Sequence, residues 1–160
     1  MKTAIVVAMK EEYDNYDLLT GVGPDYVRNS FPDFIKENND LELVINFGTC
    51  GSFKKEYHGM YSISSFSNTL NSKRLGDDRG LHLVSHYEFL TDAQGFSNAD
   101  LVDCEAFWLK ELCDENNLQF QCFKYVTDYV GENCIDDFRK HVEDGKESFD
   151  LIYRKIYENS

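Results

Sequence analysis

The sequence predicts one compact α/β domain of three layers, with a mostly parallel (mixed) central sheet flanked by helices. First, the continuous apolar run Thr3–Ala8 is typical of a strand buried on both faces. Second, strand-like and helix-like segments alternate along the chain, as they do where helices connect parallel strands. Third, 160 residues with 42% hydrophobic content suit a single domain over residues 1–160 with a buried core.

Further strands are expected wherever a short apolar run ends at turn-forming residues. These runs are Leu41–Phe47, Tyr61–Phe66, Leu81–Ser85, Ala99–Asp103 and Gln119–Thr127. Between them, the glycines of Gly48–Ser52 predict a sharp turn, and the polar stretch Asn68–Gly80 predicts an exposed loop. The acidic stretch Glu11–Leu19 predicts a loop or one to two helical turns.

Helices are expected in three regions. A first helix opens at Gly21–Pro24, is broken or kinked by Pro32, and ends at Asn38–Asp40. A second covers Glu105–Asn117, and one or two more cover about Ile135–Tyr157. In the second helix one face carries Ala106, Leu109, Leu112, Cys113 and Asn116.

Composition excludes several classes of function. A net charge of −13 argues against a protein that binds nucleic acid through the phosphate backbone, which requires clusters of Lys and Arg. The apolar runs are shorter than the roughly 18 residues of a membrane span, so no membrane partner is expected. The 5 cysteines are odd in number and lack a CxxC motif, which favours reduced thiols and a cytoplasmic protein.

Acidic residues follow three of the expected strands: Glu12, Glu105 and Asp128. Ligands of parallel sheets bind outside the carboxyl ends of the strands, where Gly48–Gly51 is also expected. The pattern predicts an acidic pocket suited to proton transfer and to recognition of sugar hydroxyls. Each acid also has a plain structural interpretation: a helix cap or turn for Asp128, a solvated glutamate for Glu12, and a first-turn helix acid for Glu105.

Metal and nucleophile chemistry are not predicted. His82 and His86 have an HxxxH spacing, which places both side chains on one face only in a helix, and Leu81–Ser85 is expected to be a strand. No turn motif supports a Ser–His or Cys–His nucleophile. Neither a metal nor a cofactor is therefore expected.

Five segments, taken in order, carry a resemblance to a known family. They are Met1–Glu12, Gly21–Gly23, Val44–Ser52, Val102–Ala106 and Phe123–Asp128. Together they resemble the nucleoside phosphorylase and nucleosidase superfamily, and most closely the 5′-methylthioadenosine/S-adenosylhomocysteine nucleosidases, in a shortened form. The chain departs from the family in the short stretch after Glu12, in the abbreviated stretch Phe53–Gln94, and in having Cys104 where the family prefers Met.

The resemblance implies a phosphorylase/hydrolase-like fold and hydrolysis of the N-glycosidic bond of a purine nucleoside or 5′-thio-nucleoside, without a cofactor. It implies that Asp128 protonates the purine at N7, that Glu12 activates water, and that Glu105 binds ribose hydroxyls. It also implies a homodimer or larger homo-oligomer. The expected substrate-binding residues are Gly48, Thr49, Cys50, Gly51, Gln94, Phe96, Cys104, Glu105 and Lys124. Lys124 shares strand parity with Asp128, so two interpretations are open: it reaches the pocket and pairs with Glu12 or Glu105, or it is a lysine at the edge of the sheet or at the mouth of the pocket.

Two alternatives remain open. In a phosphorylase, the glycine turns would hold inorganic phosphate, with Arg28 as a weak candidate for its cation. The pair Glu11–Glu12 would repel such a dianion, so hydrolysis is favoured. The shortened chain could also be a non-catalytic nucleoside-binding module.

Overall fold

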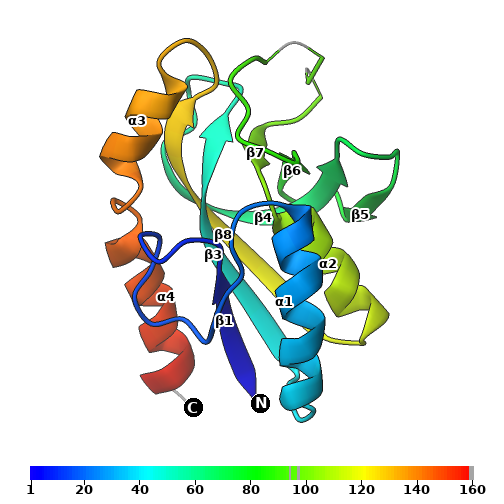
Figure 1. Cartoon of the computed structure of the whole chain (residues 1–160). Helices are drawn as coiled ribbons and strands as arrows, with labels where there is room; N and C mark the ends of the chain where they lie inside the picture. The colour runs from blue at the N-terminus through cyan, green and yellow to red at the C-terminus, as the bar shows by residue number, and fades with distance from the viewer. Residues whose placement is uncertain (94, 97, 159–160) are drawn as a thin grey trace.

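The computed structural model describes residues 1–93, 95–96 and 98–158. In these residues one mixed sheet of eight strands is flanked by four helices (Figure 1). The strands are β1 (Thr3–Val7), β2 (Leu18–Leu19), β3 (Leu43–Ser52), β4 (Gly59–Asn68), β5 (Arg74–Gly76), β6 (Leu81–Ser85), β7 (Leu101–Asp103) and β8 (Gln119–Tyr129). The helices are α1 (Pro24–Glu37), α2 (Ala106–Glu115), α3 (Cys134–His141) and α4 (Lys146–Glu158).

Alternation along β1 builds two separate cores. Val6 belongs to a cluster that includes Phe31 of α1 and side chains of α2. Its neighbours Ile5 and Val7 point the other way, into a cluster that includes Phe149 of α4. Because β1 is buried on both faces from Ala4 to Val7, its sequence is apolar at each of these positions. The α/β class and the mixed sheet expected from the sequence are confirmed, with helices on both faces.

The strand pairings close a ring. β3 pairs in parallel with β8, β8 pairs antiparallel with β4, and β4 pairs in parallel with β6. β6 then pairs in parallel with β7, which returns antiparallel to the end of β3. The ring brings Gly51 next to both Val102 of β7 and Asp128 of β8.

Two expectations about the strand ends were wrong. The segment Gly48–Ser52 is not a turn, because β3 continues through it to Ser52. β8 runs alongside and supplies the pairing, with a register shift between Cys50 and Gly51. For the same reason Asp128 lies inside β8 and not beyond its end. Tertiary pairing here overrides the local tendency of glycines to form turns.

Smaller differences concern the helix and loop boundaries. α1 continues through Pro32, so the expected break was wrong; Val27 and Phe31 keep the preceding turn packed on the core. β2 lies in a stretch expected to be loop or helical turns, and pairs with Val6 and Val7. β5 likewise forms within the expected loop by pairing with β4. No helix in the described part of the chain is long and apolar enough to cross a membrane.

Candidate active site

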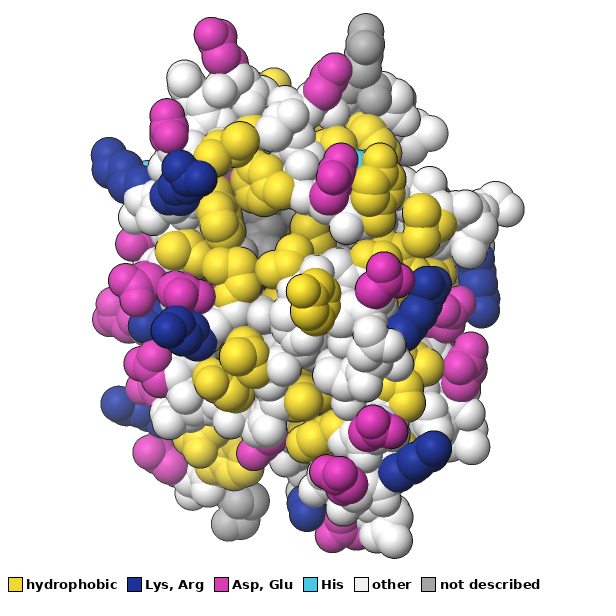
Figure 2. Space-filling model, in the orientation of Figure 1, with side chains coloured by type: hydrophobic (Ala, Val, Ile, Leu, Met, Phe, Trp, Pro, Cys, Tyr) yellow, Lys and Arg dark blue, Asp and Glu magenta, His cyan; other side chains and the backbone are white. Residues whose placement is uncertain are grey.

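A pocket opens where the ends of β3, β7 and β8 meet. It holds about 480 Å³ of empty space, part of it open to solvent. Figure 2 shows hydrophobic side chains gathered around a hollow in the upper half of this face. Of the residues expected at the site, those that line the pocket are Glu12, Thr49, Cys50, Gly51, Cys104, Glu105 and Asp128.

Glu12 is buried and its carboxylate accepts four hydrogen bonds. Oε1 accepts from the backbone N–H groups of Ala8 at 3.1 Å and Met9 at 2.9 Å. Oε2 accepts from the backbone N–H of Thr49 at 2.6 Å and from its hydroxyl at 2.9 Å. Burial raises the pKa of Glu12, while the charge of Lys124 and these hydrogen bonds oppose the rise. Glu12 therefore ties the loop after β1 to the middle of β3.

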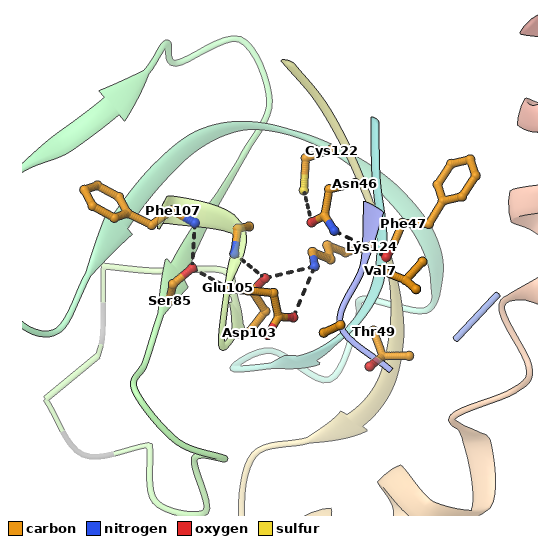
Figure 3. Close-up of polar contacts among 12 residues, drawn as sticks. Val7, Asn46, Phe47, Thr49, Ser85, Asp103, Glu105, Phe107, Cys122 and Lys124 are labelled. Carbon is orange, nitrogen blue, oxygen red and sulfur yellow. Dashed lines mark hydrogen bonds and ion pairs between the residues drawn. The ribbon is translucent and has the colours of Figure 1, made fainter. Parts of the chain in front are cut away.

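Lys124 of β8 is completely buried, and its ammonium group points toward Asp103 and Glu105 (Figure 3). Its Nζ is 2.9 Å from Oδ2 of Asp103 and 3.7 Å from Oε1 of Glu105. Burial alone would lower the pKa of Lys124, but the neighbouring carboxylates outweigh it and hold the pKa well above its ordinary value. The expected pairing of Lys124 with Glu105 is present, and Asp103 is the nearer partner.

Asp103 is a site residue that the sequence analysis did not identify. Oδ1 accepts a short hydrogen bond of 2.5 Å from Ser85, and Oδ2 accepts one of 2.9 Å from the N–H of Ala106 (Figure 3). The same Ser85 hydroxyl accepts from the N–H of Phe107 at 3.0 Å. Asp103 therefore holds two groups in place: the first turn of α2 and the ammonium group of Lys124. Its position two residues before Glu105 was the available signal.

Glu105 occupies the N-cap position of α2 at the edge of the pocket, and its carboxylate is incompletely hydrogen-bonded. It is 4% exposed, and among the described residues its Oε2 has no hydrogen-bond partner. Burial raises the pKa of Glu105 well above its ordinary range, and the charge of Asp103 adds to the rise. A buried oxygen without a donor is costly. Hydroxyl groups of a bound ligand would satisfy it.

Asp128 has the properties of a proton donor. Burial raises its pKa to about 6, although the Thr127 hydroxyl donates to Oδ1 at 2.7 Å. A Cβ placed on Gly51 would lie 2.8 Å from Oδ2, so glycine leaves room for this carboxyl group. The thiols of Cys50 and Cys104 line the same pocket, and burial raises the pKa of both. These cysteines therefore stay protonated, whereas Asp128 titrates close to neutrality.

Gly48 supports the site from below and does not line it. A Cβ at this position would lie 2.5 Å from Nζ of Lys124 and 3.2 Å from Oε2 of Glu12. We expect Gly48→Ala to displace the ammonium from Asp103 and to lower the free energy of unfolding by about 1–3 kcal/mol, as overpacking of a core does. Urea unfolding measures this effect. In a Lys124→Ala background the added cost should disappear, and an unchanged cost there would contradict the explanation.

Other expected residues lie elsewhere. Phe96 stacks on Phe53 with ring centroids 5.9 Å apart and is not among the residues lining the pocket. Gln94 lies outside the described residues. The apolar wall is formed instead by Phe89 and Phe138, whose centroids are 5.2 Å apart. The chain has 12 Phe and 10 Tyr, and no sequence pattern separated these two rings from the other aromatics.

The histidines are engaged in hydrogen bonds away from the pocket. His82 lies between the hydroxyls of Ser65 and Ser67, at 2.7 and 2.8 Å, and His86 contacts the hydroxyl of Thr69 at 2.9 Å. In the part of the chain that the structure describes, no group of three or more His, Cys, Asp or Glu residues could hold a metal ion.

Comparisons with known proteins point to one fold. No family model matches the sequence, and no curated protein matches it. Among solved structures, a putative 5′-methylthioadenosine/S-adenosylhomocysteine nucleosidase from Francisella philomiragia is similar with a TM-score of 0.79 at 12% identity, over 97% of this chain and 98% of that one. A mutant nucleosidase from Helicobacter pylori with 5′-methylthioadenosine in its active site gives 0.75 at 11% identity, over 90% and 92%.

A third similar structure is the futalosine hydrolase of Helicobacter pylori. Its TM-score is 0.76 at 11% identity, over 91% of this chain and 92% of that one. Identities this low establish the fold alone. The chain has the nucleoside phosphorylase and nucleosidase-like fold that its sequence motifs predict.

Proposed function

We propose that this protein hydrolyses the N-glycosidic bond of a purine nucleoside or 5′-thio-nucleoside and releases the free base. The observation that carries the proposal is Asp128, a pocket carboxyl group whose pKa burial raises to about 6. It faces the same pocket as Glu12 and Glu105. The solved structures of similar fold include nucleosidases, one with methylthioadenosine in its active site, and a futalosine hydrolase.

Each acid has a distinct task in the proposed reaction. Asp128 gives its proton to N7 of the purine as the bond between C1′ and N9 breaks and its electron pair passes to the base. Positioned acids and bases of this kind contribute about 10²–10⁴-fold in rate. Glu105 accepts hydrogen bonds from the ribose hydroxyls, and the nearby carboxylates stabilise the positive charge that develops on the sugar. Water then adds to C1′, and Glu12 is the final acceptor of the proton that water loses.

Hydrolysis is favoured over phosphorolysis by the charge of the pocket. The described residues that line it include no Lys, Arg or His. The buried cation, Lys124, is already paired with Asp103 at 2.9 Å. A phosphate dianion would therefore meet carboxylates without a free cation, which is unfavourable in a buried site. Arg28 of α1 does not line the pocket either.

Base release from methylthioadenosine, adenosine and inosine tests the proposal. We expect free base from at least one of them in buffer without phosphate, detected by chromatography. Release only with phosphate, together with ribose 1-phosphate, would establish a phosphorylase. Binding by calorimetry without release would establish a binding module.

We also propose that the protein is a homo-oligomer. Val22 and Phe89 at the mouth of the pocket are 41% and 38% exposed, and a second copy would cover them. Sedimentation of the same samples tests this proposal.

A further inference from the structure

The hydrogen bonds of Glu12 leave it no free acceptor position for a water molecule. A carboxylate offers about four lone-pair positions. Glu12 receives four donors, two on each oxygen, at distances between 2.6 and 3.1 Å. Although Glu12 lines the pocket, a water there cannot hydrogen-bond its carboxylate without displacing one of these donors.

Three of the four donors are held in place by the backbone. The N–H groups of Ala8 and Met9 belong to the turn that Glu12 closes by donating its own N–H to the carbonyl of Met9 at 3.1 Å. The N–H of Thr49 belongs to β3, which pairs with β1 up to Asn46 and with β8 at Thr49 itself. Removing any of these would require part of the chain to move.

The fourth donor, the hydroxyl of Thr49, differs from the others. It is 2.9 Å from Oε2 of Glu12, and Thr49 lines the pocket. A hydroxyl that donates its proton keeps two lone pairs with which it can accept a hydrogen bond. It can therefore accept from a water molecule in the pocket while it still donates to Glu12.

We propose that the hydroxyl of Thr49 is a catalytic proton relay between the attacking water and Glu12. This inference rests on the proposed hydrolysis. As the water oxygen bonds to C1′, one water proton passes to Oγ1 of Thr49, and the hydroxyl proton of Thr49 passes to Oε2 of Glu12. The C1′–N9 electron pair leaves with the purine, which takes a proton from Asp128. Glu12 ends protonated and Asp128 ionised, and both recover by exchange with solvent.

The surroundings of Glu12 suit an acceptor of this proton. Burial raises the pKa of Glu12 above that of an exposed glutamate, which strengthens it as a base. Lys124 opposes that rise and favours the ionised form before the reaction. A carboxylate whose pKa is raised in this way is a better base than a solvated one.

Three substitutions of Thr49 test the relay because they separate its hydroxyl from its shape. Thr49→Val replaces the hydroxyl with a methyl group of similar size, so we expect kcat to fall by about 10²-fold or more with little change in KM. Thr49→Ser keeps the hydroxyl and should remain within a few-fold of the wild type. Thr49→Ala leaves space for a water molecule in place of the hydroxyl, so its rate should fall between those of the Ser and Val variants.

A matched control removes a different threonine hydroxyl that also contacts a titratable side chain. Thr69 contacts His86 at 2.9 Å and does not line the pocket, so Thr69→Val should leave kcat unchanged. Thermal unfolding of each variant establishes that the folded enzyme is being compared. If Thr49→Val does not fold, Thr49→Ala and Thr49→Ser decide the matter: an Ala variant as fast as the Ser variant overturns the relay.

The outcomes separate this inference from the proposed function. A wild type that releases base and a Thr49→Val variant that is equally fast would overturn the relay alone and leave the hydrolase in place. A wild type that binds nucleoside but releases no base would overturn both. Loss of turnover in Thr49→Val with recovery in Thr49→Ser supports the relay, because a purely structural role of the residue would not depend on the hydroxyl.

Discussion

Asp128→Asn is expected to stop base release and, at the same time, to make the protein more stable at pH 8. Burial raises the pKa of Asp128 to about 6, whereas an unfolded aspartate titrates near 4. Between about pH 4 and pH 6 the folded protein therefore binds more protons than the unfolded chain, and the free energy of unfolding falls as pH rises. Above about pH 6 the folded protein carries the full cost of ionising the buried Asp128. A difference of two pKa units between the folded and unfolded states corresponds to about 3 kcal/mol.

Urea unfolding at pH 4.5 and pH 8 measures this effect. The asparagine can still accept the hydrogen bond of Thr127, so the gain in unfolding free energy should be about 1–3 kcal/mol at pH 8 and much smaller at pH 4.5. In the wild type the same pKa should make kcat/KM fall above about pH 6, as the protonated acid is lost. An Asp128→Asn variant that still releases base, or that is no more stable at pH 8, would contradict the assignment.

Asp77→Asn is the matched control for this prediction. Asp77 is exposed, and its hydrogen bonds with Arg79 lower its pKa to about 2. A lowered pKa has the opposite effect on stability. The ionised form of Asp77 stabilises the fold above the unfolded pKa, and this contribution is lost as pH falls toward 2. Asp77→Asn should therefore give no increase in stability at pH 8, although it removes the same charge from the same type of residue.

The acids of the site could be predicted because their signal is local. The apolar run of β1 marks a strand buried on both faces, and the ends of such strands are where ligands bind. Glu12 and Asp128 follow or end such runs, and the structure places both at one pocket. The five segments that resemble one family, taken in order along the chain, supported the same two residues. The sequence therefore predicted which acidic side chains lie at the edge of the sheet.

The contacts between distant segments could not be predicted in the same way. Gly48–Ser52 has the composition of a turn, and only its pairing with β8 makes it a strand. Asp103 has the local pattern of a residue before a helix, and its ion pair with Lys124 joins β7 to β8. Phe89 and Phe138 meet through tertiary packing of a loop on α3. Each of these features depends on a partner far away in the chain.

Lys124→Met should destabilise the protein more than any other single substitution at the site. Methionine is close to lysine in length but carries no charge, so the ammonium is removed while most of the volume remains. The carboxylates of Asp103 and Glu105, 1% and 5% exposed at their side chains, then lose their buried cation. Breaking a buried pair in this way costs about 3–5 kcal/mol, because an uncompensated charge stays in the interior.

The size of this loss should depend on pH, which distinguishes lost charge from poor packing. The pKa of Glu105 is already raised by burial, and loss of Lys124 should raise it further. Protonation then relieves the unpaired charge, so the variant should lose more stability at pH 8 than at pH 5 in urea unfolding.

Lys73→Met provides the matched control, because Lys73 lies 2.9 Å from Glu111 with side chains 50% and 22% exposed. An ion pair of the same length on the surface is worth about 0–1 kcal/mol. Because the shortest N···O distances of the two lysines are equal, a larger cost for Lys124→Met reflects its burial and its second carboxylate partner, Glu105. Equal losses in the two variants, or a Lys124→Met cost that does not change with pH, would show that Lys124 is not the cation on which the acidic site depends.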